Sequence, residues 1–365
     1  MLRGGECNGK FFGNATMMTS GWQRLLEHAG AQIAAGEVQD FGSPEHESRM
    51  AESGEVIADL SHRALIAVRG ADAEAFLQGQ LTNDIHGVNT SHSQLSAHCT
   101  PKGRVLSLLR VFRRDDLLYL ALPEALLQGT LARLRKYVLM SKVRLEPDNA
   151  LAQMGYSDAT GADHLRECLA PLPEAIDTVT RSGEITILRV PGPYPRYELI
   201  GPPMSLGSLW DALRVHAAPV GAGPWELLDI LGGVPVLHPE TLEAFVPQML
   251  NLDVFSGINF KKGCYTGQEI VARTHYLGKL KRRMFRLYCA AEPPPPATPL
   301  FNTAHREDEG VGVVAAARPA PNGGAALLAV LQVEATTQGE LHLGRLDGPL
   351  CTVQPLPYSL ESASR

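Results

Sequence analysis

The sequence predicts an α+β protein of several domains whose last part is rich in β structure. Its 365 residues exceed what one ordinary core accommodates, so two or three domains are expected. Between residues 64 and 147 the apolar pattern runs strand, helix, strand, strand, helix, strand, which is typical of helices on one side of an antiparallel sheet. Beyond a tetra-proline run at 293–296, short β-type runs separated by Gly- and Pro-rich turns indicate a small β-barrel or sandwich.

The N-terminal part predicts one helix. Trp22, Leu25, Leu26 and Ala29 follow helical spacing. Residues 1–17 are too polar and Gly-rich for a signal peptide, and we interpret them either as a disordered extension or as a stretch upstream of the natural start. The polar, Gly/Ser/Glu-rich stretch around 36–55 predicts a linker.

The first α+β unit opens with a strand at 64–70. Asp72 is placed to cap the helix that follows. Two strands, 104–112 and 117–122, flank a charged turn, and a strand at 142–147 closes the unit. Between them lies a long helix, one face of which is formed by Leu126, Leu127, Leu131, Leu134 and Val138.

A second unit extends from about 150 to 250. It contains short strands at 185–190 and 196–200 and a helix at 208–215. We therefore divide the chain into an N-terminal extension and helix (1–50), two α+β domains (51–150 and 151–280) and a C-terminal β domain (281–365).

Composition narrows the classes of function. A formal net charge of −6 argues against a general nucleic-acid coat, so any contact with RNA is expected to be local or indirect. No stretch reaches the roughly 18 apolar residues of a membrane helix. The cysteines are scattered without zinc-site spacing, which favours reduced thiols in a cytoplasmic protein. They are Cys7, Cys99, Cys168, Cys264, Cys289 and Cys351.

The segment NFKKGCYTGQEIVAR, at 259–273, is the most informative part of the chain. Its two glycines predict a shaped turn, and QEIVAR predicts the start of a helix with Glu269 at its positive end. Cys264 is then expected beside Lys261, Lys262 and the helix terminus, a setting that favours the thiolate. The alternative is that Cys264 is a small core residue in a Gly-rich turn.

The same region is unusually basic. Residues 251–290 contain eight cations and two anions, a charge of +6 that leaves −12 for the rest of the chain. Such a patch indicates either an anionic ligand or a solvated surface. The cations are Lys261, Lys262, Arg273, Lys279, Lys281, Arg282, Arg283 and Arg286.

At this motif the chain resembles the YgfZ family of the aminomethyltransferase superfamily. The family signature is K-G-C-Y-x-G-Q-E followed by Arg, and further similar segments, such as 76–85 and 245–253, extend the likeness over about residues 55–361. The matching positions are Lys262, Gly263, Cys264, Tyr265, Gly267, Gln268, Glu269 and Arg273.

The resemblance implies an aminomethyltransferase-like folate-binding fold, with three domains around a folate-sized cavity and a C-terminal antiparallel β-barrel. It also implies binding of tetrahydrofolate or a derivative, and support of iron–sulfur enzymes such as those that thiolate tRNA. Cys264 would be the functional thiol. One cysteine cannot hold a stable cluster, so we predict no stable metal and at most a transient iron–sulfur contact there.

Three residues are predicted to contact folate. Trp225 matches a folate-contacting tryptophan of the family, and an indole face suits stacking on a pterin, although a lone tryptophan is more often core. A second family tryptophan corresponds to Arg63, which can stack on a ring or pair with a carboxylate. Glu198 resembles the carboxylate that binds the pterin in aminomethyltransferases; it could equally be an exposed strand residue.

The catalytic pattern of the aminomethyltransferases is absent. Ser107 and Leu108 stand where those enzymes carry an aspartate pair, so glycine-cleavage activity is not expected. The second candidate function is a one-carbon transferase of the aminomethyltransferase or demethylase type, against which the missing aspartate pair argues. A third candidate function is direct tRNA binding through residues 261–286.

Overall fold

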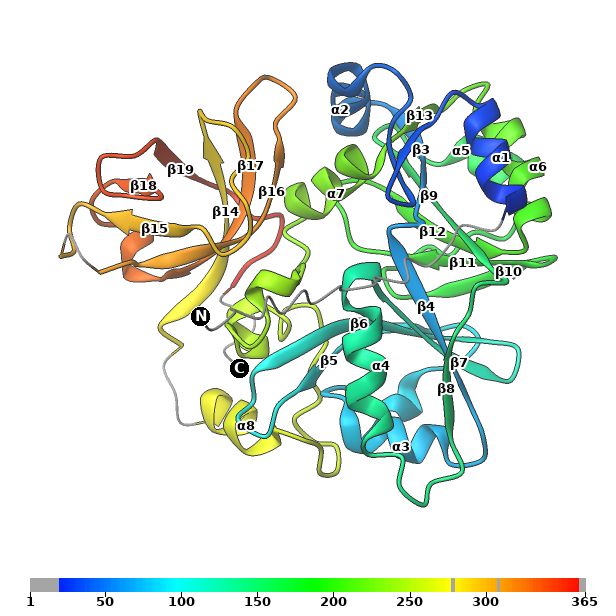
Figure 1. Cartoon of the computed structure of the whole chain (residues 1–365), viewed down its shortest axis with the longest axis horizontal. Helices are drawn as coiled ribbons and strands as arrows, with labels where there is room; N and C mark the ends of the chain where they lie inside the picture. Colours follow the sequence, from blue (N-terminus) through cyan, green and yellow to red (C-terminus); the bar gives the residue numbers. More distant parts are fainter. Residues whose placement is uncertain (1–19, 277–279, 307–308, 361–365) are drawn as a thin grey trace, which may run out of the picture.

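Two β-sheets pack together at one end of the molecule and a β-barrel forms the other end (Figure 1). The structure is a computed structural model that describes residues 20–276, 280–306 and 309–360. The predicted extension at residues 1–17 lies outside this range. Among the described helices, none has the length and apolar character needed to cross a membrane.

The lower sheet in Figure 1 has the antiparallel order β5-β6-β7-β4-β8. Helices α3 (Ala73–Gln80) and α4 (Leu127–Arg135) bury their apolar faces against one side of it. The predicted alternation of strands and helices is confirmed, with one further strand that the sequence did not reveal. The strands are β4 (Arg63–Arg69), β5 (Gln94–Cys99), β6 (Val105–Arg114), β7 (Leu117–Pro123) and β8 (Arg144–Pro147).

Three local predictions are wrong. Asp72 precedes α3 but makes no side-chain cap; its carboxylate instead accepts a hydrogen bond of 2.6 Å from the Lys142 backbone N–H. α4 ends at Arg135, so Val138 lies beyond it. The stretch 36–55 is structured, because buried Glu47 accepts hydrogen bonds from the backbone of Phe41 (2.7 Å) and Gly221 (2.9 Å). That stretch forms β2 (Glu37–Asp40), α2 (Pro44–Ser53) and the start of β3. β2 pairs with β1 (Gln32–Ala34).

The upper sheet has the order β10-β11-β12-β9-β3-β13, and only its β3–β13 pair is parallel. α1 (Ser20–His28), α5 (Asp163–Cys168) and α6 (Pro203–Leu213) cover its outer face, so the predicted helix at 208–215 begins and ends earlier than expected. The strands are β3 (Glu55–Asp59), β9 (Ala152–Asp158), β10 (Val179–Ser182), β11 (Ile185–Arg189), β12 (Arg196–Gly201) and β13 (Ala218–Val220).

The inner faces of the two sheets share a core. Leu65 and Phe112 from the lower sheet pack with Leu188 and Ile200 from the upper one. α7 (Ala222–Leu231) bridges this pair of sheets to the barrel, because Leu228 packs toward β3 while Leu227 joins the cluster that contains barrel residues. The three parts of the molecule therefore meet around α7 (Figure 1).

The C-terminal part is a closed antiparallel barrel of order β14-β17-β16-β15-β18-β19. Of the two sequence-based alternatives, barrel or sandwich, the barrel is confirmed, and the mostly antiparallel sheets with their helices confirm the α+β class. Its strands are β14 (Arg282–Cys289), β15 (Pro299–Asn302), β16 (Gly312–Pro319), β17 (Ala325–Gln332), β18 (Leu341–Leu343) and β19 (Leu350–Gln354).

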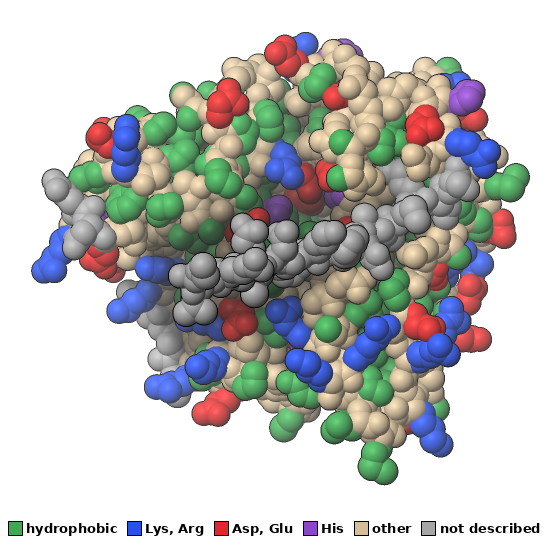
Figure 2. Space-filling view, viewed as in Figure 1, with side chains coloured by type: hydrophobic (Ala, Val, Ile, Leu, Met, Phe, Trp, Pro, Cys, Tyr) green, Lys and Arg blue, Asp and Glu red, His purple; other side chains and the backbone are tan. Residues whose placement is uncertain are grey.

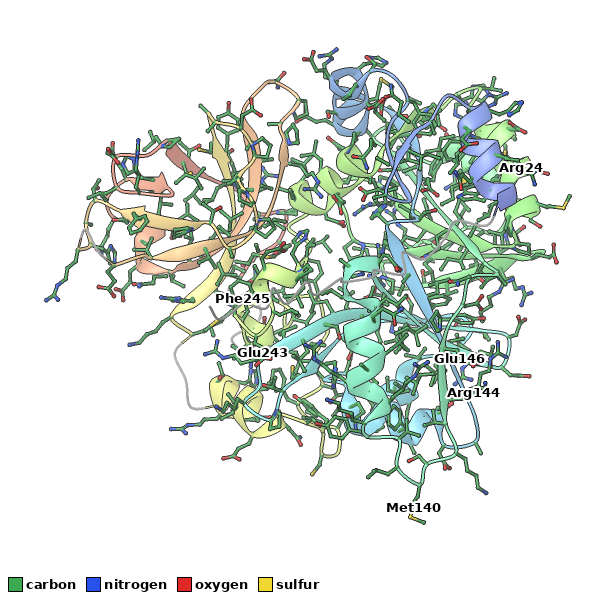
Figure 3. All side chains as sticks on the ribbon, viewed as in Figure 1. Arg24, Met140, Arg144, Glu146, Glu243 and Phe245 are labelled. Carbon is green, nitrogen blue, oxygen red and sulfur yellow. The ribbon has the colours of Figure 1, made fainter. Side chains whose placement is uncertain are left out.

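The connection from α7 to the barrel returns to the lower sheet. Glu243 donates its backbone N–H to Val105 O at 3.0 Å, and Phe245 O accepts the Val105 N–H at 2.9 Å. Both residues are labelled in Figure 3 beside the start of β6. This segment leads into α8 (Gln268–Tyr276), so the Cys264 motif is held against the lower sheet.

Candidate functional site

A cavity lies where the inner faces of the two sheets meet the segment 234–237 that follows α7. It contains about 720 Å³ of space between atoms, a figure that includes its open mouth to solvent. Figure 2 shows histidine and acidic side chains in the hollow between the barrel and the sheets. The apolar part of the wall is formed by Leu95, Leu108, Val190, Val236 and Leu237.

Arg63 and Glu198 form an ion pair in the wall of this cavity. Arg63 opens β4 of the lower sheet, and Glu198 lies on β12 of the upper sheet. Arg63 Nη1 donates to Glu198 Oε1, whereas Oε2 is buried and has no hydrogen-bond partner among the described atoms. The structure thus brings together two of the three predicted folate residues, and leaves one carboxylate oxygen free.

The other charged side chains of the wall are committed to partners. Arg110 donates to Asp177 at 2.6 Å, and Arg196 forms an ion pair with Asp229. Glu226 pairs with Arg318 of the barrel, and this ion pair connects α7 to β16. Sequence reasoning missed these groups because their partners are distant in the chain.

His62 is a further cavity residue that the sequence did not single out. Its Nδ1 is buried without a hydrogen-bond partner in the described part of the chain. Burial lowers the pKa of His62 below its usual value of 6.5, so the ring is neutral at pH 7. A neutral imidazole offers one donor and one acceptor to a ligand. Because His62 precedes Arg63, a predicted folate residue, its place in the sequence could have identified it as a candidate.

Trp225 does not line the cavity. Its side chain is fully buried among β3, β13 and α2, and one indole face lies under the guanidinium of Arg196, 4.0 Å from ring centre to Cζ. On another side it fills the space beside Gly155, where an added Cβ would come within 2.6 Å of the ring. Trp225 therefore supports Arg196, which does line the cavity. Direct stacking on a ligand would require Arg196 to move.

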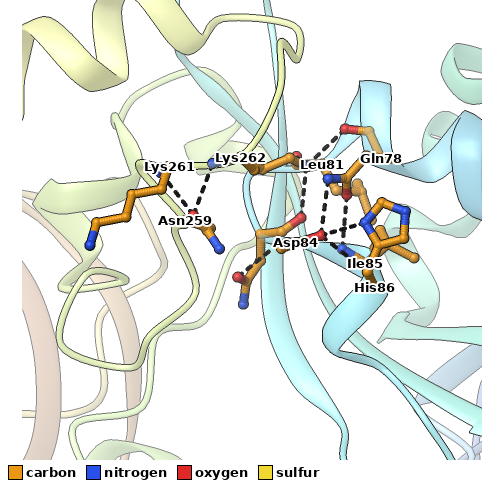
Figure 4. A network of polar contacts seen from close by, with 9 residues as sticks. Gln78, Leu81, Asp84, Ile85, His86, Asn259, Lys261 and Lys262 are labelled. Carbon is orange, nitrogen blue, oxygen red and sulfur yellow. Dashed lines mark hydrogen bonds and ion pairs between the residues drawn. The ribbon is translucent and has the colours of Figure 1, made fainter.

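Lys262 of the cysteine motif points into the protein. Its Nζ donates to the carbonyl oxygens of Gln78 (2.8 Å), Leu81 (2.7 Å) and Asn83 (2.8 Å), at the C-terminal end of α3 (Figure 4). Unpaired carbonyls at a helix end attract cations, so the ammonium acts as a cap for α3. Burial lowers its pKa from 10.5 to about 8. The contacts of the Lys262 ammonium are therefore with backbone carbonyls at the end of α3.

Cys264 itself is exposed, on the loop that precedes α8. The alternative interpretation of Cys264 as a core residue is excluded, although the cysteine is not among the residues that line the cavity. Tyr265, by contrast, is buried, and burial raises the pKa of its phenol. The thiol thus faces solvent while its two neighbours in the motif, Lys262 and Tyr265, anchor the loop.

The glycine-shaped turn is confirmed at Gly267, which has φ +86°. An added Cβ there would lie 2.4 Å from Thr100 O and 3.0 Å from Gly103 Cα. Gly263 shows no such requirement, since a Cβ added there would have no described atom within 4 Å. The helix predicted after the turn is α8, with Gln268 and Glu269 in its first turn and exposed Arg273 in its last.

The predicted basic patch is smaller than the charge count suggested. Besides Lys262, Arg283 is buried and pairs with Asp253 at 2.7 Å. Lys279 lies outside the described residues. Exposed cations of the segment are Lys261, Arg273, Lys281 and Arg282. Figure 2 shows Lys and Arg side chains spread over the lower half of the molecule rather than concentrated at one point.

Ser107 and Leu108 lie side by side on β6 and face opposite ways. Leu108 lines the cavity, whereas the Ser107 hydroxyl is buried without a partner in the described structure. Apolar side chains and not a carboxylate therefore form this part of the wall. Within the described residues, no three His, Cys, Asp or Glu side chains are arranged to hold a metal ion.

Comparison with known proteins identifies the architecture. No protein-family model matches the chain. Among solved structures, the glycine cleavage system aminomethyltransferase T from Bartonella henselae superposes with a TM-score of 0.77, over 93% of this chain and 97% of that one, at 19% sequence identity. The chain has the aminomethyltransferase fold.

At that sequence identity, the aminomethyltransferase likeness establishes the fold alone. A heterotetrameric sarcosine oxidase from Corynebacterium sp. U-96 matches 48% of this chain and 95% of its own, at 12% identity. Its TM-score of 0.34 is too low to support an argument. Within the aminomethyltransferase-like fold, the cavity with Arg63 and Glu198 occupies the junction between the two sheets, α7 and the segment that leads to the barrel.

Proposed function

We propose that this chain is a folate-binding accessory protein of the YgfZ type, which supports iron–sulfur enzymes and thereby tRNA thiolation. The observation that carries the folate part is the unpaired Oε2 of Glu198, buried in a cavity of an aminomethyltransferase-like fold whose wall has both charged and apolar side chains. A buried carboxylate oxygen without a partner costs free energy, which a ligand N–H would recover.

The cavity matches the chemistry of a pterin. Glu198 would accept from ring or exocyclic N–H groups of tetrahydrofolate or a derivative, and Leu95, Leu108 and Val236 would cover the faces of the flat ring. Leu108 supplies no carboxylate near such a ring, which supports an accessory role over the alternative of aminomethyltransferase or demethylase chemistry.

The iron–sulfur part of the proposal rests on Cys264. An exposed thiol on an anchored loop is accessible to a partner protein, and a single thiolate can complete a shared or transient cluster site. The proposed partners are iron–sulfur enzymes, among them tRNA-thiolating proteins. Direct contact with tRNA would use exposed cations of the same segment, such as Arg273 and Lys281.

Titration calorimetry tests the folate site. We expect folic acid and tetrahydrofolate to bind the wild-type protein, and Glu198→Gln to weaken binding at least about tenfold, because a hydrogen bond to a charged acceptor is lost. Glu334→Gln, on the exposed surface of the barrel, is the matched control and should leave affinity unchanged. Equal binding by wild type and Glu198→Gln would contradict the assignment.

Complementation tests the role of the thiol. In cells that lack their own relative of this protein, we expect Cys264→Ser to fold normally but to restore less thiolated tRNA than wild type. Cys168→Ser removes another exposed cysteine, on α5, and should behave as wild type. Full restoration by Cys264→Ser would remove the iron–sulfur part of the proposal and leave folate binding intact.

A further inference from the structure

The Arg63–Glu198 pair presents two kinds of hydrogen-bonding group side by side. Glu198 is only 3% exposed, and its free Oε2 is an acceptor that no described atom satisfies. Arg63 uses Nη1 to hold the other oxygen, and its side chain, 19% exposed, also lines the cavity. A guanidinium carries five N–H donors and accepts none.

This pairing defines the complementary ligand edge. Arg63 can serve only a hydrogen-bond acceptor, and the adjacent Glu198 oxygen only a donor. A ring carbonyl next to a ring N–H, the lactam edge of a 4-oxo pteridine, offers both in the same plane. A neutral 4-amino pteridine offers a donor where Arg63 also donates, and its ring nitrogen next to the amino group carries no hydrogen for Glu198 to accept.

The other charged groups of the cavity wall are already bound to partners and do not form a second such pair for the lactam edge. Arg110 is held by Asp177 and Ser93, at 2.6 and 3.2 Å, and Arg196 by Asp229 and the Trp225 carbonyl, the latter at 2.9 Å. Glu226 is held by Arg318. Among the described residues of the cavity wall, Arg63 is thus the cation whose ion-pair partner carries a buried carboxylate oxygen without a hydrogen-bond partner.

We propose that Arg63 is a specificity-determining residue: with Glu198 it selects 4-oxo pteridines and rejects their 4-amino analogues. This inference rests on the proposed folate site. Sites built to hydrogen-bond a polar group discriminate strongly against analogues that leave buried groups unpaired. An aromatic residue at position 63 could stack on either ring system and could not distinguish them in this way.

The test compares folic acid with aminopterin, which differs from it at the 4-position, where an amino group replaces the oxygen. By calorimetry on the full chain, we expect wild type to bind folic acid at least about tenfold more tightly than aminopterin. Arg63→Met removes the donors and the charge but keeps a chain of similar length, and should bring the ratio close to one or reverse it. Arg63→Lys keeps a cationic donor and should retain a preference for folic acid.

The outcomes separate the two proposals. Equal affinities in wild type, or the same ratio in wild type and Arg63→Met, would overturn the role of Arg63 while leaving the folate site in place. Binding of neither compound at millimolar concentration would overturn the folate site and this inference together. Thermal unfolding of each variant establishes that it is folded; should Arg63→Met unfold, the wild-type ratio and the Arg63→Lys ratio decide.

Discussion

Replacing Lys262 by methionine should lower the free energy of unfolding by about 3 kcal/mol or more. Methionine fills a similar volume but donates no hydrogen bond, so the carbonyls of Gln78, Leu81 and Asn83 lose the donor that they share. A buried acceptor left without a partner costs roughly 1–3 kcal/mol. Relief of the buried charge offsets part of this loss. Equilibrium unfolding in urea measures the difference.

Lys261→Met is the matched control for that experiment. Lys261 is exposed and adjacent, and its side chain makes no hydrogen bond in the described structure, so its loss should change stability by no more than about 0.5 kcal/mol. Equal effects of the two substitutions would show that Lys262 does not cap α3.

The pH dependence of the Lys262 effect has a definite sign. Its pKa is about 8 in the folded protein against an ordinary value of 10.5, so between these limits the unfolded chain binds more protons than the folded one. The stability of wild type relative to Lys262→Met should therefore rise as the pH increases from 8 to 10.5. Below pH 8 both states carry the proton, and the difference should level off at its lower value. Urea unfolding of the two proteins across this pH range measures the slope.

Trp225→Ala should destabilise the protein by about 3–5 kcal/mol, the usual cost of truncating a large buried aromatic side chain. The change empties space against Gly155 and removes the surface on which the Arg196 guanidinium rests. Because Arg196 lines the cavity, we also expect folate affinity to fall through its displacement. Urea unfolding and titration of folic acid measure the two effects separately.

Trp225→Phe distinguishes support from direct contact. Phenylalanine keeps an aromatic face beneath Arg196, so we expect a smaller loss of stability and an affinity for folic acid within about threefold of wild type. A stable Trp225→Phe protein that no longer binds folic acid would indicate that the indole itself contacts the ligand, as the family resemblance implies.

Periodicity was a sound guide to the elements of the chain. The alternation at 64–70 and the helical spacing after Asp72 identified β4 and α3, because one face of each is buried against a common core. It failed for α2, which is polar throughout most of its length. There the Glu47 carboxylate connects the nearby Phe41 backbone to that of Gly221, which is 174 positions away, and a local sequence pattern does not reveal the second contact.

The candidate site was only partly predictable. The cysteine motif and its glycine turn were visible because Gly267 must adopt a positive φ against Thr100, which restricts the residue type locally. The direction of Lys262 was not visible, since its acceptors lie about 180 positions earlier in the chain. Proximity in sequence suggested Cys264 as the neighbour of the ammonium, whereas its hydrogen bonds go to the end of α3.

By itself, the sequence determined most of the order of strands and helices between residues 64 and 147, the barrel at the C-terminus as one of two alternatives, and a glycine-shaped turn around Cys264. The tertiary structure alone decided which polar atoms face the cavity. Arg63 and Glu198 are 135 positions apart, and their pairing depends on two sheets meeting face to face. Hydrogen bonds of a few ångströms are set by that packing, so a one-dimensional pattern can nominate such residues but cannot orient them.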